Sequence, residues 1–222
     1  MNHYPLLMKY IDSMCVITKE NYDFRIGKAP VTVGLWKEFC RATRTDMPDA
    51  PWWGWLDDHP MVNVSWNEVM TEYGFCRWVN SVSGSNYTLP LDTEWEFVAH
   101  GGQSWSYPWG EEFDRSKLWC SGDKRGDAKQ TASVDRASNI YENSYGVTDL
   151  SGNCREWCIT LMKMPNGTRY PFTRDDCRIA KGGSWVNRGD HYFKVNSKTI
   201  YDADTRSNEV GFRIISAQLL AE

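Results

Sequence analysis

The side chains most able to bind a transition metal, cysteine and histidine, are spread along the whole chain. Seven of the 222 residues are cysteines, and no two of them form a Cys-x-x-Cys pair. Structural zinc sites usually contain such pairs, so the spacing argues against zinc. The four histidines are equally scattered, at positions 3, 59, 100 and 191. The cysteines therefore fit the pattern of reduced, mostly buried thiols in a cytosolic protein.

A polar segment late in the chain is a better candidate for a functional site. Residues 181–215 open with KGGSW and close with GFRII, and the polar stretch between them has neither helical nor strand periodicity. Long polar loops held between apolar anchors commonly carry binding or catalysis. The alternative is a loop that packs on its own domain and binds nothing. The candidate ligand-binding residues are Trp185, Asn187, Asp190, His191, Tyr192, Asn196, Tyr201, Asp202 and Asp204.

The rest of the sequence predicts the scaffold that positions this segment. Apolar residues at helical spacing follow Thr32, and a capping-box pattern formed by Ser65 and Glu68 begins a helix expected to run to Gly84. A shorter helix is expected over residues 94–100. The twelve tryptophans are many for this length, and they indicate irregular segments fixed by aromatic rings. Short strands are expected at residues 15–17, 24–26, 60–64, 87–90 and 211–215.

Composition and charge exclude several classes of partner. The formal net charge is −4 and no basic stripe occurs, so nucleic acid is not expected to bind. No stretch reaches the roughly 20 apolar residues that a membrane helix needs, so membrane insertion is not expected. The first residues do not resemble a signal peptide. We expect one domain over residues 1–222, either cytoplasmic or associated with a virion or cell surface without a signal peptide.

Seven short pieces, taken in order, resemble the sulfatase-modifying-factor family, which is named for the formylglycine-generating enzyme. The pieces are APVTVGLWKEFC, HPMVNVSWNEV, YTLPLDTEWEFVAHGG, YPWG, YGVTDLSGNCREW, KGGSW and EVGFRII. The resemblance covers roughly residues 28–215. It implies a C-type-lectin-like fold of the α+β class, with small antiparallel sheets, two or three helices and much irregular structure.

The resemblance also locates the family's catalytic chemistry. Its enzymes use two cysteines after the Gly-Gly-Ser-aromatic turn to bind copper(I), which suits soft thiolate ligands. The matching positions here hold Asn187 and Tyr192, and no cysteine follows Cys177. We therefore expect no copper and no catalysis of that kind. The alternative is a metal-dependent oxidoreductase of the same family whose active site has moved elsewhere.

A calcium site is the second feature that the resemblance implies. In the family, a segment like TDLSGNCREW wraps one calcium ion. The matching ligands would be the carboxylates of Asp149 and Glu156 and the backbone carbonyls of Gly152 and Cys154. Calcium takes hard oxygen ligands, so the residue types are suitable. The alternative is a turn without metal, in which Asp149 bonds local backbone and Glu156 is solvated or pairs with Arg155.

Some proteins of this fold are variable proteins of diversity-generating retroelements, in which a segment ahead of Gly-Phe-Arg is mutagenised at adenines. Changed asparagine codons yield mainly the residue types that fill residues 186–210 here. Tyrosine, asparagine and serine are also typical of adaptable binding surfaces. The sequence thus favours a non-catalytic protein that displays residues 185–208 to a protein or cell-surface ligand, with diversification by a retroelement as a further hypothesis.

Overall fold

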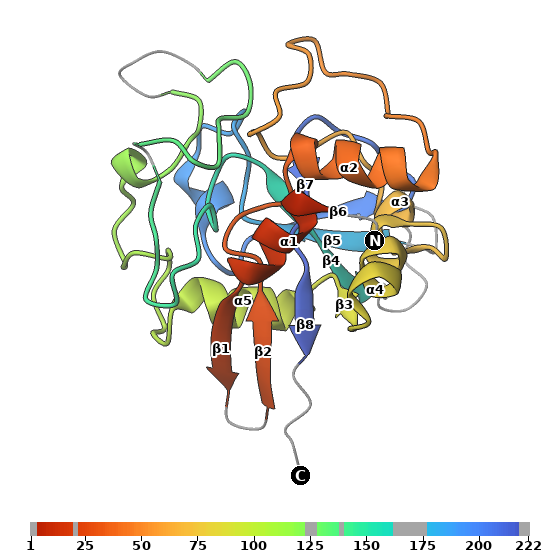
Figure 1. The fold of residues 1–222 in the computed structure, drawn as a ribbon. Coiled ribbons are helices and arrows are strands. Elements are labelled where there is room, and N and C mark those ends of the chain that lie inside the picture. The colour runs from red at the N-terminus through yellow and green to blue at the C-terminus, as the bar shows by residue number, and fades with distance from the viewer. Residues whose placement is uncertain (1–3, 20–21, 123–127, 138–139, 162–176, 218–222) are drawn as a thin grey trace, which may run out of the picture.

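The computed structural model describes residues 4–19, 22–122, 128–137, 140–161 and 177–217. The α+β fold expected from the sequence is confirmed, and two four-stranded sheets form its centre. The first has the strand order β1-β2-β8-β3, and all its pairs are antiparallel. Its strands are β1 (Cys15–Lys19), β2 (Tyr22–Ile26), β3 (Tyr87–Thr88) and β8 (Ile215–Ala217). In Figure 1, β1, β2 and β8 run side by side at the bottom of the molecule, beneath α5 (Asp92–His100).

The second sheet carries the polar segment and has the order β6-β5-β4-β7. It consists of β4 (Arg155–Leu161), β5 (Cys177–Lys181), β6 (Lys198–Asp202) and β7 (Val210–Gly211). The small antiparallel sheets expected from the resemblance are present, with one parallel pair, in which β7 runs beside β4. The polar segment leaves the sheet after β5, returns as β6, and returns again as β7. Both of its ends are thus fixed in one sheet.

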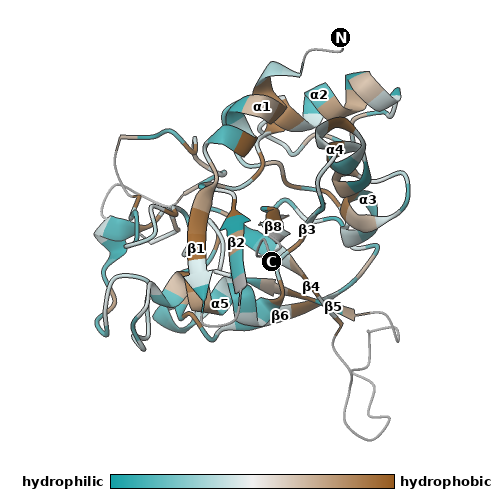
Figure 2. Ribbon diagram, turned by 60° about the horizontal axis from the view of Figure 1, so that its bottom comes forward, coloured by the Kyte–Doolittle hydropathy of each residue, from teal (hydrophilic) through white to brown (hydrophobic). Residues whose placement is uncertain are grey.

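The helices gather at one end of the molecule, where α1 (Pro5–Asp12), α2 (Val33–Thr43), α3 (Trp66–Met70) and α4 (Phe75–Ser83) lie together (Figure 2). The side chain of Thr32 caps α2 by accepting a hydrogen bond from the backbone of Leu35, as expected. Helix α1 has no counterpart in the predicted elements. Its first backbone N–H groups are satisfied from α2, because the buried carboxylate of Glu38 accepts a hydrogen bond from the Leu7 backbone at 2.9 Å.

The single helix expected from Ser65 to Gly84 is in fact two helices. The Ser65–Glu68 capping box is present and begins α3, but the backbone becomes extended at Thr71. Helix α4 starts only after Gly74, where an added Cβ would lie 2.8 Å from the carbonyl oxygens of Glu68 and Val69. Glycine permits this close approach of backbone to backbone. The apolar spacing continues through the break because both helices pack on the same core.

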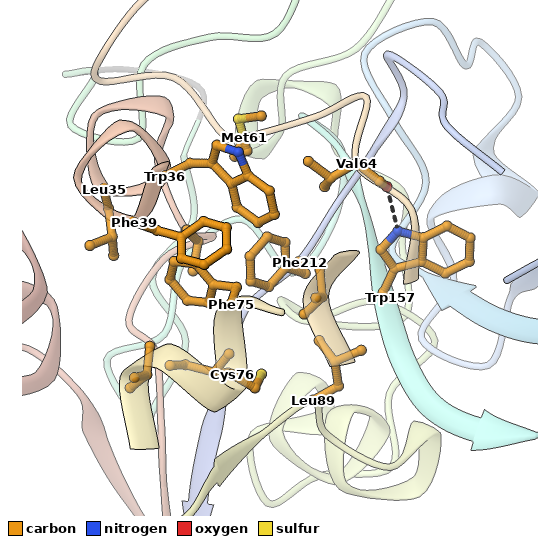
Figure 3. Close-up of a cluster of buried hydrophobic side chains, with 14 of the residues drawn as sticks. Leu35, Trp36, Phe39, Met61, Val64, Phe75, Cys76, Leu89, Trp157 and Phe212 are labelled. Atoms are coloured by element: carbon orange, nitrogen blue, oxygen red, sulfur yellow. Dashed lines mark hydrogen bonds between the residues drawn. The ribbon is translucent and has the colours of Figure 1, made fainter. Parts of the chain in front are cut away.

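That core is aromatic and joins the helices to the chain end. The ring of Trp36 stacks on Phe75 with centroids 5.6 Å apart, and Phe212 meets both rings edge-on. Figure 3 shows these rings together, with the indole N–H of Trp157 donating to the carbonyl oxygen of Val64. Such contacts add to the free energy gained from burying the rings. The expected strand at 60–64 is absent as an element, since Pro60 forms only an isolated bridge with Thr32.

Helix α5 begins at Asp92, slightly earlier than expected, and it ends at Gly101 in the left-handed conformation. The Glu94 carboxylate accepts a hydrogen bond from the Leu91 backbone N–H at 2.8 Å, so this acid has a structural role at the start of the helix. None of the helices in the described residues is both long and apolar enough to cross a lipid bilayer.

Candidate functional site

The Gly-Gly-Ser turn fixes where the polar segment starts. Gly182 and Gly183 have φ angles of +93° and +68°, a region that side chains strongly disfavour. A Cβ on Gly183 would also lie 2.7 Å from the ring of Phe193. The turn therefore packs directly on the next part of the segment, the 3-10 helix η3 (Asp190–Phe193). Ser151 strengthens this contact by donating its hydroxyl hydrogen to the Phe193 carbonyl at 2.9 Å.

A buried hydrogen-bonded cluster follows the turn, and we call it the Arg155 cluster. Arg155 on β4 donates to the hydroxyl oxygen of Ser184 and the side-chain oxygen of Asn187, both at 2.9 Å, and to Thr199 at 3.2 Å. It also forms an ion pair with Glu209. Ser184 donates both its backbone N–H and its hydroxyl hydrogen within the cluster, to Asn187 and Glu209 at 2.9 Å. Asn187 is thus firmly held rather than free to meet a ligand.

A row of three tryptophans leads from this cluster to solvent. The indole of Trp185 donates to the carbonyl oxygen of Asn208 at 3.0 Å, and its ring lies edge-on to Trp53 at 5.4 Å. Trp53 in turn meets Trp52 edge-on at 5.4 Å, and Trp52 is 68% exposed. Two of these three rings come from the loop that follows α2. The candidate surface therefore extends beyond residues 185–208.

The predicted residues on β6 belong to the edge of the same site. The ring of Tyr201 lies edge-on to Trp157 at 5.6 Å, and burial raises the pKa of its hydroxyl, with Arg155 opposing and Glu209 adding to the effect. Asp202 accepts a hydrogen bond from the Cys177 thiol across the strand pair. Tyr201 therefore lies close enough to the Arg155 cluster to feel the charges of Arg155 and Glu209.

The most accessible predicted residues lie on and after η3. Asp190, His191 and Tyr192 are exposed, and the rings of His191 and Tyr192 are 4.1 Å apart. Asn196 and Asp204 are exposed as well. No described contact tests whether these five residues bind anything, so their role in binding stays a prediction.

Sequence analysis missed four residues of the site: Arg155, Glu209, Trp52 and Trp53. Arg155 stands between a cysteine and a glutamate in a buried strand, and its neighbours give no sign that it points to a polar cluster. Glu209 precedes the GFRII motif, and its sequence neighbours suggest an ordinary solvated acid. The Trp52–Trp53 pair is conspicuous in the sequence, but it lies well over one hundred residues before the polar segment. Nothing in the sequence indicates that this pair contacts Trp185.

Three of the residues expected to bind calcium lie on the turn before β4, the fourth, Glu156, lies within β4, and each carboxylate already has a cationic partner. Asp149 has a φ angle of +56°, and its buried carboxylate forms a two-pronged ion pair with Arg136. The amide of Asn153 also donates to it at 3.0 Å. The backbone N–H of Gly152 donates to the Gly182 carbonyl at 2.8 Å, which joins this turn to the Gly-Gly-Ser turn.

Glu156 is buried completely and pairs with Arg213 of the GFRII motif. The two guanidinium nitrogens lie 2.5 and 2.6 Å from the two carboxylate oxygens, and the indole of Trp95 donates to one of them at 2.8 Å. Burial alone would lower the pKa of Arg213, but the charge and hydrogen bonds of Glu156 outweigh it and raise that pKa. Arg213 also donates to backbone carbonyls of residues 27, 28 and 148.

This arrangement does not fit a calcium ion shared by Asp149 and Glu156, because both carboxylates are occupied by arginines. Cys154 contributes a buried thiol whose pKa is raised well above its usual value by burial. Across the described ranges, no group of three or more histidine, cysteine, aspartate or glutamate side chains could hold a metal ion. Calcium binding itself is not measured by these contacts and stays a prediction.

A cavity of about 640 Å³ lies away from the polar segment. One face of α1 lines it, together with the start of α2 and Val134, Asp135, Arg136, Ile140 and Glu142. The charged side chains that line it include Lys28 and Glu142, which form an ion pair at 2.6 Å, and Asp57, which pairs with Lys37 at 2.6 Å. None of its lining residues belongs to residues 185–208.

Comparison with known proteins agrees with this geometry. The chain is 32% identical over 170 residues to a Bos taurus protein named "Inactive C-alpha-formylglycine-generating enzyme 2", covering 72% of this chain and 50% of that protein. A Thermomonospora curvata "Formylglycine-generating enzyme" is 26% identical over 204 residues, covering 75% and 64%. The chain thus spans about half the length of the first of these relatives and less than two thirds of the second.

Among solved structures, "Treponema denticola variable protein 1" has the same fold, with a TM-score of 0.71, 18% identity, and coverage of 92% of this chain and 95% of that one. PvdO from Pseudomonas aeruginosa gives a TM-score of 0.64 at 20% identity, covering 88% and 81%. The family description "Sulfatase-modifying factor enzyme 1-like domain" matches residues 15–218. The chain therefore belongs to the sulfatase-modifying-factor family.

Proposed function

We propose that this chain is a non-catalytic, ligand-binding member of its family that recognises a protein or cell-surface ligand through residues 185–208. One observation carries the proposal. Asn187 stands where the resemblance puts the first catalytic cysteine, and its side-chain oxygen accepts hydrogen bonds from Arg155 and from the backbone of Ser184. A position built for a metal-binding thiolate is thus filled by an amide inside a hydrogen-bonded cluster.

The surroundings of Asn187 support binding in place of chemistry. The second catalytic cysteine position holds Tyr192, which is 39% exposed on η3 beside the exposed ring of His191. The row of Trp185, Trp53 and Trp52 adds further rigid aromatic area, which begins within residues 185–208. Aromatic rings beside short polar side chains are typical of surfaces that recognise other macromolecules.

The names of related proteins also support a non-catalytic function. A relative sharing 32% identity is named as an inactive enzyme. The structural neighbour named as a variable protein supports the hypothesis of diversification, although its 18% identity shows only a shared fold. If residues 185–208 are diversified, sibling copies of this gene will differ at exposed positions such as Asp190 and Tyr192. They will keep the Arg155 cluster unchanged. Sibling sequences that are invariant over 185–208 would remove the diversification hypothesis.

A binding experiment tests the proposal directly. The labelled chain is applied to an array of cell-surface proteins and glycans, and each interaction is re-measured with Tyr192→Ala. Tyr73→Ala is the matched control, because Tyr73 is 81% exposed but lies between α3 and α4. We expect Tyr192→Ala to weaken binding about tenfold or more, the effect of removing an aromatic anchor, while Tyr73→Ala binds normally. Equal binding by both variants would reject residues 185–208 as the binding surface.

A separate experiment tests the alternative hypothesis, a metal-dependent oxidoreductase with a relocated active site. The purified chain is incubated with copper(I), oxygen and a cysteine-containing peptide, and the peptide is analysed for conversion of its thiol to an aldehyde. We expect no conversion, because neither Asn187 nor Tyr192 supplies a thiolate. Turnover in this assay would establish a relocated metal site and refute the non-catalytic function.

A further inference from the structure

We propose that the guanidinium of Arg136 takes the place of a metal ion beside Asp149, so that the turn of residues 149–156 is held without calcium. This inference is independent of the ligand-binding function above. It concerns how the turn that carries β4, and with it Arg155, is stabilised. It also concerns both carboxylates expected to bind calcium, since each of them is paired with an arginine.

Three donors occupy the Asp149 carboxylate, two from Arg136 and one from Asn153. Arg136 donates to one oxygen at 2.9 Å and forms an ion pair through the other, while the amide of Asn153 donates at 3.0 Å. The side chain of Asp149 is 1% exposed and that of Arg136 is 10% exposed. A paired guanidinium and carboxylate with two parallel hydrogen bonds is a strong and directional contact.

The position of Arg136 is set by the fold. The side chain of Asn153 accepts a hydrogen bond from the backbone N–H of Ala132 at 2.9 Å and donates to the Ala132 carbonyl at 3.1 Å. The backbone N–H of Val134 donates to the Asp58 carbonyl at 2.9 Å. Arg136 itself donates to the Ser133 carbonyl at 2.9 Å. The segment before Arg136 is therefore bound to the turn through Ala132 and to the loop before Pro60 through Val134, and these contacts position Arg136 beside Asp149.

Calcium would have to compete with Arg136 for this carboxylate. Calcium takes six to eight oxygen ligands, so it needs acceptor oxygens that are not already receiving N–H groups. A second cation beside the guanidinium would also be repelled, and this repulsion is screened poorly because the site is buried. The other expected carboxylate is also paired with an arginine, since Arg213 binds both oxygens of the buried Glu156. Arginine thus supplies positive charge to both acids of the turn.

Thermal unfolding with and without calcium tests this assignment. The parent chain, Arg136→Gln and the control Arg77→Gln are each melted in a chelator, in calcium and in magnesium. Arg77 is an exposed arginine on α4. We expect the parent and the control to have the same Tm in all three conditions. In chelator, Arg136→Gln should melt roughly 6–15 °C lower, because Asp149 becomes an unpaired buried charge.

Calcium should then stabilise Arg136→Gln, because the vacated carboxylate becomes available to a cation and binding to the folded state raises Tm. Three results would overturn the proposal: a parent Tm that falls on chelation, an Arg136→Gln variant as stable as the control, or an Arg136→Gln variant that calcium does not stabilise. Should Arg136→Gln fail to fold, calorimetric titration of the parent with calcium decides the question, since heat of binding at one ion per chain would contradict us and its absence would agree.

Discussion

Replacing Arg155 by methionine should cause a large loss of stability, although the change leaves the hydrophobic core intact. Methionine keeps much of the apolar stem but removes the hydrogen bonds to Ser184, Asn187 and Thr199 and the ion pair with Glu209. Taking one partner out of a buried pair costs about 3–5 kcal/mol. Because the Glu209 side chain is 29% exposed, water compensates part of this loss, and we expect about 2–4 kcal/mol.

Urea unfolding followed by tryptophan fluorescence measures this free energy. A loss of about 2–4 kcal/mol corresponds to a fall in Tm of roughly 5–15 °C for a chain of this size. Trp185 makes the assay sensitive to the site, because its indole bonds the backbone at Asn208, next to Glu209. A variant within about 0.5 kcal/mol of the parent, the range of an ordinary surface substitution, would refute our account of the cluster.

The double variant Arg155→Met with Glu209→Gln separates the two contributions. If much of the loss comes from leaving the Glu209 carboxylate without a counter-ion, neutralising that carboxylate should recover part of the stability. Exact additivity of the two single variants would show that the residues do not interact. The Tyr73→Ala chain serves as a control for handling and concentration, because it removes an exposed ring far along the chain from the cluster.

Three smaller predictions follow from single side chains. Burial lowers the pKa of His59, so the folded state disfavours its protonation, and the free energy of unfolding should fall as the pH drops below about 6.5, the pKa of histidine in an unfolded chain. His59→Gln should reduce this pH dependence in urea titrations at about pH 7.5 and about pH 5.5. An unchanged pH dependence would contradict us. Gly183→Ala should lower Tm, because the added Cβ meets the Phe193 ring at 2.7 Å in a strained backbone region; a Tm equal to the parent's would exclude this contact. Alkylation of the native chain, read by mass spectrometry, should modify the partly exposed Cys15 before Cys154, whose burial raises its pKa well above normal; the reverse order would show that the 149–156 turn opens readily.

The class of fold could be predicted because its signals are local or come in a fixed order. The capping box at Ser65 and the cap at Thr32 are hydrogen bonds between residues three apart, so their sequence pattern is enough to place a helix start. The single strand predicted at residues 211–215 is wrong, because Gly211 ends β7, residues 212–214 lie outside both sheets, and β8 begins only at Ile215. The pairing of β8 with β2 and β3 could not be predicted, because strand pairing joins distant parts of the chain.

The candidate site was predictable only in outline, because its energetics depend on charges that meet across the fold. Residues 185–208 were predicted as a polar loop between two apolar anchors, but the structure places η3 and the strand β6 within them. Yet Asn187 is held by Arg155, which lies 32 residues earlier, and Asp149 by Arg136, which lies 13 residues earlier. The residue types around Asp149 suited calcium and equally suited a guanidinium partner. Only the contacts distinguish these possibilities.

The stretch from Val210 to Ala217 supplies one strand to each sheet, β7 to the second and β8 to the first. Strand β8 is also the sole link between β2 and β3 within their sheet as described, since it pairs with both. A nascent chain still lacking these residues would hold an unpaired hairpin and an incomplete second sheet. Synthesis must therefore run nearly to this point before the molecule can acquire its native cooperativity, and a premature stop just upstream would release a polypeptide for proteases to clear.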